Sequence, residues 1–519
     1  NDKKSEKVSV KIDIDGIKER ITVLPIAPSN YRKLISVNDK LYYMRVGSRD
    51  TKPLLLMYDL TKQSEVELGN INNYEISFDK KKMLVSQDGS YAIIDLPQTK
   101  IEIKDKLNTT GLETFVNKKE EWKQIYNECW RQMRDFFYAP NMHGVNWQEV
   151  KKKYEELIPF VNCRQDLTYI IGEMIGELNC GHTYVGGGDI QRGKRIPMGL
   201  LGAELEQDIN TKFYRIKRIL KGQNWDKSLR SPLTEIGVNV KEGDYIIEID
   251  GTSTNKVNNI YELLINKANK QVKLKINSIP SDKGSREVTV LPIDDESSLY
   301  YFNWVQSNIE KVNKATNGQV GYIHIPDMSA QGLNEFVKYY YPQLQKKALI
   351  IDDRGNGGGN VSPIITERLR REWAFINMAR NTSPSVDPGG TFIGPKVLLL
   401  DEYSASDGDL FPYRFRKHNL GKLIGKRSWG GVVGIRGTLP LIDGGELNKP
   451  EFAKYDTEGK DWVIEGFGVE PDIVIENDPA KEYEGVDDQL NKAIEVILQE
   501  LKTKEKTIPP IPKYPDKSK

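Results

Sequence analysis

The spacing of apolar residues changes three times along this chain of 519 residues, and these changes constrain the fold more than any other feature. In roughly the first hundred residues, short apolar runs stand between polar turns, which predicts strands such as Lys40–Arg45, Leu54–Asp59 and Tyr91–Asp95. An apolar run followed by Asp-Leu occurs at 57–60 and again at 93–96, a repeat close to the length of a propeller blade. Because two blades cannot close a ring, this region is predicted to be either part of a larger β-propeller or a small independent sandwich.

Helical spacing begins at Lys118. Apolar and aromatic residues recur three and four positions apart over 122–137, as on the face of a helix that packs into a core. Two more helices are predicted at Trp147–Ile158 and Gln165–Leu178. The helical part ends shortly before His182, and several glycines follow this histidine. We therefore expect His182 in a glycine-rich turn just beyond the end of a helix.

Strands return from about Ile196 to Leu291, around one predicted helix at Asn259–Lys267. Two strings in this segment, Gly199–Ala203 and Val240–Gly251, resemble parts of a PDZ domain. In that domain the backbone amides of a Gly-Leu-Gly-like loop bind a peptide carboxylate, and the peptide adds a strand to the sheet edge. The alternative is a β-rich insert without affinity for peptides. The peptide-contacting residues that the resemblance implies are Leu200, Leu201, Gly202 and Ala203.

Strands alternate with helices from about Tyr300 to Leu501, which predicts an α/β domain with a largely parallel sheet. Such sheets gather ligands at the carboxyl ends of their strands, where polar loops carry the functional groups. Three loops of this kind are candidates: 352–360, which contains consecutive glycines, 404–409, which leads into a helix, and 462–472, where a strand is expected to carry Glu465 beside glycines. The predicted strands are Val320–Ile325, Ala348–Asp352 and Lys396–Asp401.

A serine at the start of the helix in the second loop could act as a nucleophile, because the helix dipole and free amides favour a developing oxyanion. A lone serine there would otherwise be interpreted as a helix cap. An activated serine needs a base, and the chain has four histidines. His324 in a strand and His418 at an exposed helix end are expected to be structural, and His143 lies in a loop. His182 is therefore the best candidate for the base.

Four strings follow one another along the chain: Asp353–Ser362, Ser404–Asp409, Leu423–Gly434 and Glu465–Asp472. Together they resemble the tricorn-type core proteases of the C-terminal-processing peptidase superfamily, which are serine peptidases. The resemblance extends over nearly the whole chain. It implies Ser406 as nucleophile, His182 as general base and Glu465 as supporting carboxylate. The oxyanion donors that it implies are the backbone amides of Asp407 and of a glycine in Gly357–Gly358.

Two positions depart from that pattern. A serine/lysine branch of the superfamily has a lysine where this chain has Gly431, so a lysine mechanism is not expected. The tricorn branch has a serine before its histidine, which links the histidine to the glutamate, whereas this chain has Gly181. A water molecule, Thr183 or a direct contact would have to replace that hydroxyl if Glu465 is to orient His182.

The expected fold class is multidomain α+β, with a partial β-propeller-like region, a helical subdomain, a PDZ-like domain and a crotonase/Clp-like α/β catalytic domain. A tail containing several prolines, which favours an extended polyproline-like conformation, closes the chain. The expected domains are 1–108 (propeller-like), 109–193 (helical), 194–297 (PDZ-like), 298–501 (catalytic) and 502–519 (tail).

Composition excludes several functions. The net charge is only +1, which argues against dedicated nucleic-acid binding, and no apolar run approaches the length of a membrane span. No metal-ligand spacing is present, and no cofactor is expected. The resemblance implies a serine endopeptidase acting on peptides or unfolded segments. The alternatives are a catalytically silent, PDZ-containing scaffold that binds peptides and, from fold analogy alone, an acyl-transfer enzyme acting on thioesters. The resemblance implies a homo-oligomer in the cytoplasm, with the periplasm as the alternative compartment.

Overall fold

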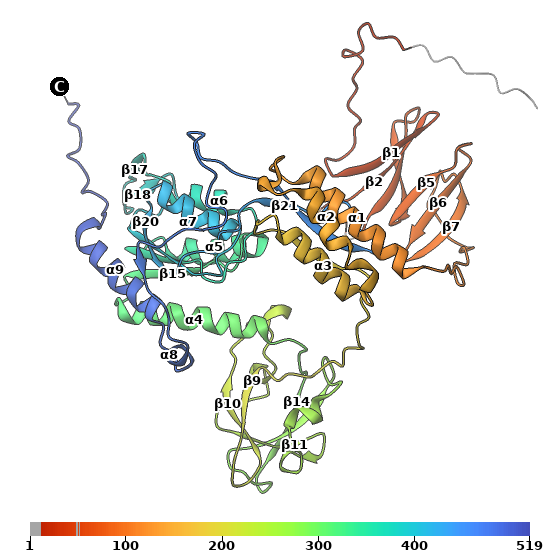
Figure 1. Cartoon of the computed structure of the whole chain (residues 1–519). Coiled ribbons are helices and arrows are strands. Elements are labelled where there is room, and N and C mark those ends of the chain that lie inside the picture. The colour runs from red at the N-terminus through yellow and green to blue at the C-terminus, as the bar shows by residue number, and fades with distance from the viewer. Residues whose placement is uncertain (1–11, 48–49, 51, 519) are drawn as a thin grey trace, which may run out of the picture. The chain divides into compact units, whose positions relative to one another are not determined.

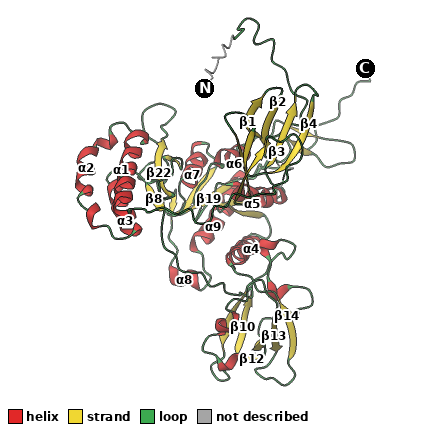
Figure 2. Ribbon diagram, turned by 90° about the vertical axis from the view of Figure 1, so that its right-hand side faces the viewer, coloured by secondary structure: helices red, strands yellow, loops and turns green. Residues whose placement is uncertain are grey.

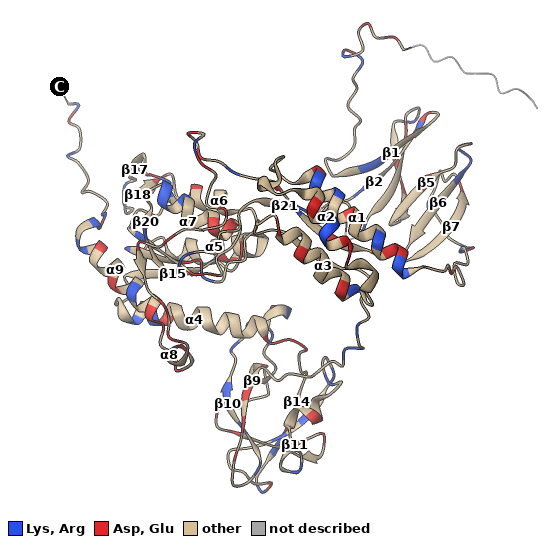
Figure 3. Cartoon of the chain, viewed as in Figure 1, with Lys and Arg blue, Asp and Glu red and all other residues tan. Residues whose placement is uncertain are grey.

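The computed structural model describes residues 12–47, 50 and 52–518. The chain divides into two compact units, Asn1–Val116 and Asn117–Lys519 (Figure 1). The boundary coincides with the change from strand-like to helical spacing at Lys118. Within the described residues, no helix is long and apolar enough to cross a membrane. Acidic and basic residues are interspersed along the chain (Figure 3), and their numbers, 74 and 75, nearly cancel.

The first unit contains a four-stranded and a three-stranded antiparallel sheet, each formed by strands consecutive in the sequence. One core joins the two sheets, with Tyr42 and Leu55 from the first and Tyr74 and Val85 from the second. The strands expected here are present, and whether the two sheets belong to a propeller stays a prediction. The strands are β1 (Tyr31–Val37), β2 (Lys40–Arg45), β3 (Leu54–Asp59), β4 (Ser64–Asn70), β5 (Asn73–Ile76), β6 (Lys82–Gln87) and β7 (Ser90–Asp95).

The second unit begins with a helical part whose aromatic face is buried, as the spacing predicts. Trp122, Tyr126 and Trp130 pack into a core with the two helices that follow. Strand β8, which begins two residues after His182, pairs with β22 from far along the chain, and β21 completes this small sheet. The histidine turn is thereby attached to the C-terminal α/β part. The elements are α1 (Lys118–Phe136), α2 (Trp147–Glu155), α3 (Arg164–Gly176), β8 (Tyr184–Gly187), β21 (Gly434–Arg436) and β22 (Gly445–Phe452).

The PDZ-like part is an antiparallel sheet in the order β14-β13-β11-β10-β9, with β9 at an edge. The expectation of a helix at 259–267 is wrong: only a 3₁₀ helix forms, at Ile260–Leu264. Ile265 instead pairs with Met198, and Asn266 adopts a positive φ of 58°, which ends the helical path. The strands are β9 (Ala203–Gln207), β10 (Tyr214–Ile219), β11 (Tyr245–Ile249), β12 (Thr252–Ser253), which pairs with β11, β13 (Val272–Asn277) and β14 (Arg286–Val290).

The α/β part has a five-stranded parallel sheet in the order β15-β16-β19-β20-β23. One apolar core between the sheet and α4 and α9 covers one face, and a second core beneath α5, α6 and α7 covers the other (Figure 2). The three layers are those expected for alternating strands and helices. The elements are α4 (Ser297–Ala315), β15 (Val320–His324), α5 (Ala330–Tyr340), β16 (Ala348–Asp352), α6 (Ser362–Leu369), β17 (Phe375–Asn377), β18 (Ser385–Asp387), β19 (Lys396–Leu400), α7 (Asp407–Lys417), β20 (Gly421–Gly425), β23 (Ile473–Val474), α8 (Pro479–Tyr483) and α9 (Asp488–Lys504).

The strand expected around Glu465 is wrong. Only Trp462 forms an isolated bridge, with Tyr455, and Glu465 lies in a turn. Ile464 and Gly466, on either side of it, have φ values of 44° and 83°. A strand needs negative φ at successive residues, so these two positions prevent one.

Candidate active site

Ser406 lies where strand β19 passes into helix α7, at the carboxyl edge of the parallel sheet. Its φ of 58° and ψ of −118° are unusual for a residue with a side chain, and such strain is found where a structure over-determines a position. Two hydrogen bonds hold the turn. The Ser406 amide donates to Asp409 Oδ2 at 2.8 Å, and the Ala405 amide donates to the Asn356 carbonyl at 2.8 Å. The backbone of Ser406 is thus held in place by this turn.

The glycine loop after β16 lies directly against this serine. A Cβ atom placed on Gly358 would stand 2.5 Å from Ser406 Cβ, so no other residue fits there without movement. The Gly358 amide donates to Asn356 Oδ1 at 2.9 Å and is therefore engaged within the loop. For the amides of Gly357 and Asp407, by contrast, the described residues supply no acceptor. These two donors are the ones free to receive a ligand oxygen.

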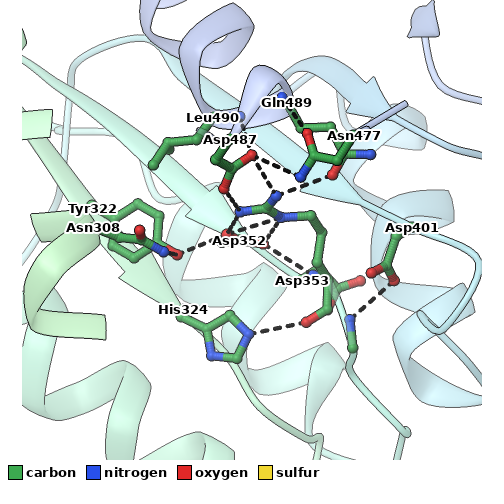
Figure 4. Close-up of polar contacts among 12 residues, drawn as sticks. Asn308, Tyr322, His324, Asp352, Asp353, Asp401, Asn477, Asp487, Gln489 and Leu490 are labelled. Carbon is green, nitrogen blue, oxygen red and sulfur yellow. Dashed lines mark hydrogen bonds and ion pairs between the residues drawn. The ribbon is translucent and has the colours of Figure 1, made fainter. Parts of the chain in front are cut away.

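A buried ion-pair network supports the base of the glycine loop (Figure 4). The Arg354 guanidinium donates to Asp352 and Asp487 at 2.6–3.0 Å, and the Arg354 carbonyl bonds His324 Nε2 at 3.0 Å. Burial lowers the pKa of His324, so this histidine is a neutral structural group, as expected. Burial, together with the charge of Asp401 and other nearby carboxylates, raises the pKa of Asp353 well above its usual value.

His182 is 6 % exposed and lies beside the Trp429 ring, with 5.6 Å between ring centroids. Its Nδ1 atom is buried and makes no well-aligned hydrogen bond, although the Val433 carbonyl lies close enough to the ring to favour its protonated form. Burial lowers the pKa of His182 below its usual value of 6.5. The imidazole is therefore neutral near pH 7, in the form that can accept a proton.

Four consecutive backbone amides at 430–433, which we call the bridging loop, connect the serine and histidine turns. Gly430 and Gly431 donate to Asp409, at 2.7 and 3.3 Å. Val432 and Val433 donate to Glu465 Oε2, at 2.7 and 3.0 Å. A further two hydrogen bonds extend the bridge to both turns: Asp409 accepts from the Ser406 amide, and Glu465 Oε1 accepts from the Gly181 amide at 2.8 Å.

The two carboxylates of this bridge differ in charge preference. Burial raises the pKa of Asp409 to about 6, although the hydrogen bonds that this carboxylate accepts from backbone amides oppose the rise. Burial also acts on Glu465, but the amides of Gly181, Val432 and Val433 outweigh it and lower the pKa of Glu465. At neutral pH Glu465 is therefore a fully charged acceptor.

Glu465 contacts the backbone beside His182 rather than its ring. Its acceptor contacts are with Gly181, Val432, Val433 and the Cys180 thiol. The Thr183 hydroxyl donates to the Cys180 carbonyl at 3.1 Å and so does not supply the hydroxyl that Gly181 lacks. A Cβ atom at position 181 would lie 3.4 Å from Glu465 Oε1 and only 2.9 Å from the Gly431 Cα.

Asn356 and Asp409 complete the serine turn but were not among the residues predicted from sequence. The spacing Ser406-x-x-Asp409 is that of a helix capping box, a signal that could have identified Asp409. For Asn356, nothing in the sequence separates it from the neighbouring polar residues of its loop.

The remaining histidines lie elsewhere. His143 bonds the Tyr138 hydroxyl and the Leu178 carbonyl, at 2.6 and 2.7 Å, and so fixes the end of the helical part. His418 follows the last residue of α7 and lies 3.4 Å from Arg370.

The predicted peptide-contacting residues lie at the start of the edge strand β9. The Leu200 amide donates to the Ile293 carbonyl at 2.7 Å, and the Leu201 side chain is buried in the PDZ-like core. The Gly202 amide donates to Glu296 Oε1 at 2.7 Å, and Ala203 is the first residue of β9.

Three family models match parts of the chain: the tricorn protease C1 domain at 118–176, the tricorn protease PDZ domain at 199–295 and peptidase family S41 at 319–475. A tricorn protease homolog of Saccharolobus solfataricus is 36% identical over 94% of this chain and 46% of its own length. A putative tricorn-like protease C-terminal subunit of Sulfurisphaera tokodaii is 34% identical over 95% of this chain and 58% of its own length. The chain spans about half the length of the curated relatives it matches.

The fold also matches a crystal structure of the tricorn protease, with a TM-score of 0.87 and 30% identity. The match covers 96% of this chain and 49% of that chain.

Proposed function

The chain belongs to the tricorn protease family of serine-type peptidases, and we propose that it hydrolyses peptides or unfolded polypeptide segments through Ser406, His182 and Glu465. The Ser406 hydroxyl attacks the scissile carbonyl while His182 accepts its proton. The carbonyl oxygen becomes an oxyanion, which the amides of Asp407 and Gly357 stabilise. His182 then returns the proton to the leaving amine, and water releases the acyl group by the same steps in reverse.

Glu465 has an indirect role in this proposal. Its contacts are with backbone amides, so it positions the turn that carries His182. Its negative charge also favours the imidazolium formed during catalysis and opposes the effect of burial on the pKa of His182. Glu465 is therefore a positioning residue here, with an electrostatic contribution.

The observation that carries the proposal is the bridging loop. One stretch of four residues holds Asp409, which fixes the Ser406 amide, and Glu465, which fixes the Gly181 amide. If Ser406 were only a helix cap, its turn would need no connection to a histidine turn from another part of the sequence. The free amides beside Ser406 give the same site a place for an oxyanion.

The test is peptide cleavage read by mass spectrometry, with a diverse peptide mixture incubated with the unaltered chain, with S406A and with H182A. We expect fragments from the unaltered chain alone. The second candidate, a silent peptide-binding scaffold, is favoured by a His182 Nδ1 that makes no well-aligned hydrogen bond. Intact peptides in all three samples, together with retained peptide binding, would support that scaffold and contradict the peptidase.

A further inference from the structure

The carboxylate-binding loop of the PDZ-like part is already occupied by a carboxylate of this chain. Glu296 Oε1 accepts the Gly202 amide at 2.7 Å, at the loop position where a PDZ domain receives a peptide carboxylate. Burial raises the pKa of Glu296, while the amides of Gly202 and Ala203 oppose that rise. The Glu296 side chain therefore takes the place of a peptide terminus on the Gly202 amide.

The segment that carries Glu296 is also packed against the loop. Glu296 immediately precedes helix α4, and Leu299 in the first turn of α4 is buried. A Cβ atom at Gly202 would lie 3.4 Å from Leu299 Cδ1, which places this side chain next to the loop. One turn further along α4, the Asn303 side chain bonds both the amide and the carbonyl of Lys221, at 3.1 and 2.8 Å.

The neighbouring sheet edge is suited to an added strand. Strand β9 begins at Ala203 and pairs only with β10, so its other edge is unpaired among the described strands. Partly buried apolar side chains, among them Leu205 and Tyr261, lie beside the PDZ-like core. The edge can thus accept a peptide backbone, but the terminal carboxylate of that peptide would meet Glu296 at the Gly202 loop.

We propose that Glu296 is an internal ligand of the Gly202 loop, and that a peptide carboxyl terminus binds along β9 only when Glu296 leaves it. This inference rests on the peptide-binding role that the resemblance to a PDZ domain implies for this part of the chain, and it adds the regulation of that role. The competing groups are chemically equivalent carboxylates, so the intramolecular one has the advantage of a high effective concentration. Displacement of Glu296 would also release the contact between this loop and the start of α4, which leads into β15 of the parallel sheet (Figure 1).

The test measures binding without cleavage, in the S406A background. The probes are a fluorescein-labelled octapeptide ending in Leu-Val-Ala with a free carboxyl group and the same peptide ending in an amide, followed by fluorescence anisotropy. We expect S406A/E296A to bind the free-acid peptide at least about tenfold more tightly than S406A, since the internal competitor is gone. The amidated peptide should show no such gain.

The matched control is S406A/D295N. Asp295 is exposed, and its side chain bonds only Ser297, so this variant removes the same charge one residue away without opening the loop. We expect its affinity to equal that of S406A. An equal gain in D295N would show a simple charge effect and overturn the proposal, as would equal affinity of S406A and S406A/E296A for the free-acid peptide.

E296Q provides a second variant in case the alanine disturbs folding, which near-UV circular dichroism would reveal. Glutamine keeps an acceptor for Gly202 but loses the charge, so an intermediate affinity is expected. Binding does not depend on turnover in this background. A failed cleavage assay with a positive E296A result would therefore count against the peptidase proposal alone.

Discussion

The two halves of the candidate active site are held in different ways. The serine turn is fixed from within the α/β part: Ser406 is strained, its amide is bonded, and Asn356 ties it to the glycine loop. The histidine turn comes from the helical part and has a neutral imidazole whose Nδ1 makes no well-aligned hydrogen bond. Hydrogen bonds within its own turn and to the glycine loop thus hold the nucleophile in place. The position of the base depends instead on the bridging loop and on Glu465.

Replacing Ser406 should have the largest effect on activity. S406A removes the nucleophile but none of the backbone bonds, so we expect a loss on the order of 10⁴-fold or more in kcat with little change in stability. S404A is the matched control, because the buried Ser404 hydroxyl donates to the Asp353 carbonyl and accepts from the Asp401 amide. S404A should instead cost about 1–3 kcal/mol of unfolding free energy. Thermal denaturation and cleavage rates should be measured on both variants. If S406A were as active as S404A, Ser406 would not be the nucleophile.

Disturbing the bridging loop should have the next largest effect. E465Q and D409N each replace an acceptor oxygen with an NH₂ group that faces backbone donors, so we expect losses in kcat of about 100-fold. E470Q is the control, since Glu470 is exposed and pairs only with Arg427 at 3.6 Å. If E465Q and E470Q had equal kcat values, the bridging loop would have no role in positioning His182.

Position 181 should sharpen the comparison further. An added Cβ lies 2.9 Å from the Gly431 Cα, so G181A should displace the bridging loop and lower kcat about tenfold. G181S has the same Cβ, but its hydroxyl can reach Glu465 Oε1 and regain part of that loss. Steady-state kinetics on the pair provides the measurement, and G181S activity below that of G181A would argue against an orienting bond between residue 181 and Glu465.

The pH dependence should show the smallest effect. Neutral His182 is the active form, and burial lowers its pKa, so the acid limb of kcat/KM should have its midpoint below 6.5. Burial raises the pKa of Asp409 to about 6, so this carboxyl protonates in the same range and should steepen the limb. A midpoint above about pH 7 in a pH-rate profile would exclude a His182 with a lowered pKa.

Sequence reasoning predicted the elements better than the connections between them. Apolar spacing located the helical part and the parallel strands because burial imposes those periods directly. It failed at 259–267 and around Glu465, because in each region residues with positive φ and an isolated bridge redirect the backbone. Ser406, His182 and Glu465 could be named from motifs. Their connection through residues 430–433 could not be predicted, because it is made by backbone amides, which nearly every residue type has.

Covalent labelling with a fluorophosphonate tests the central claim most directly, since it needs an activated serine but no cognate substrate. Intact mass spectrometry followed by peptide mapping should show one adduct, on Ser406, in the unaltered chain. H182A should suppress this adduct, and E465Q should slow its formation while E470Q does not. A chain that stays unlabelled, or that labels Ser406 equally fast without His182, would contradict a serine and histidine held together as a working pair.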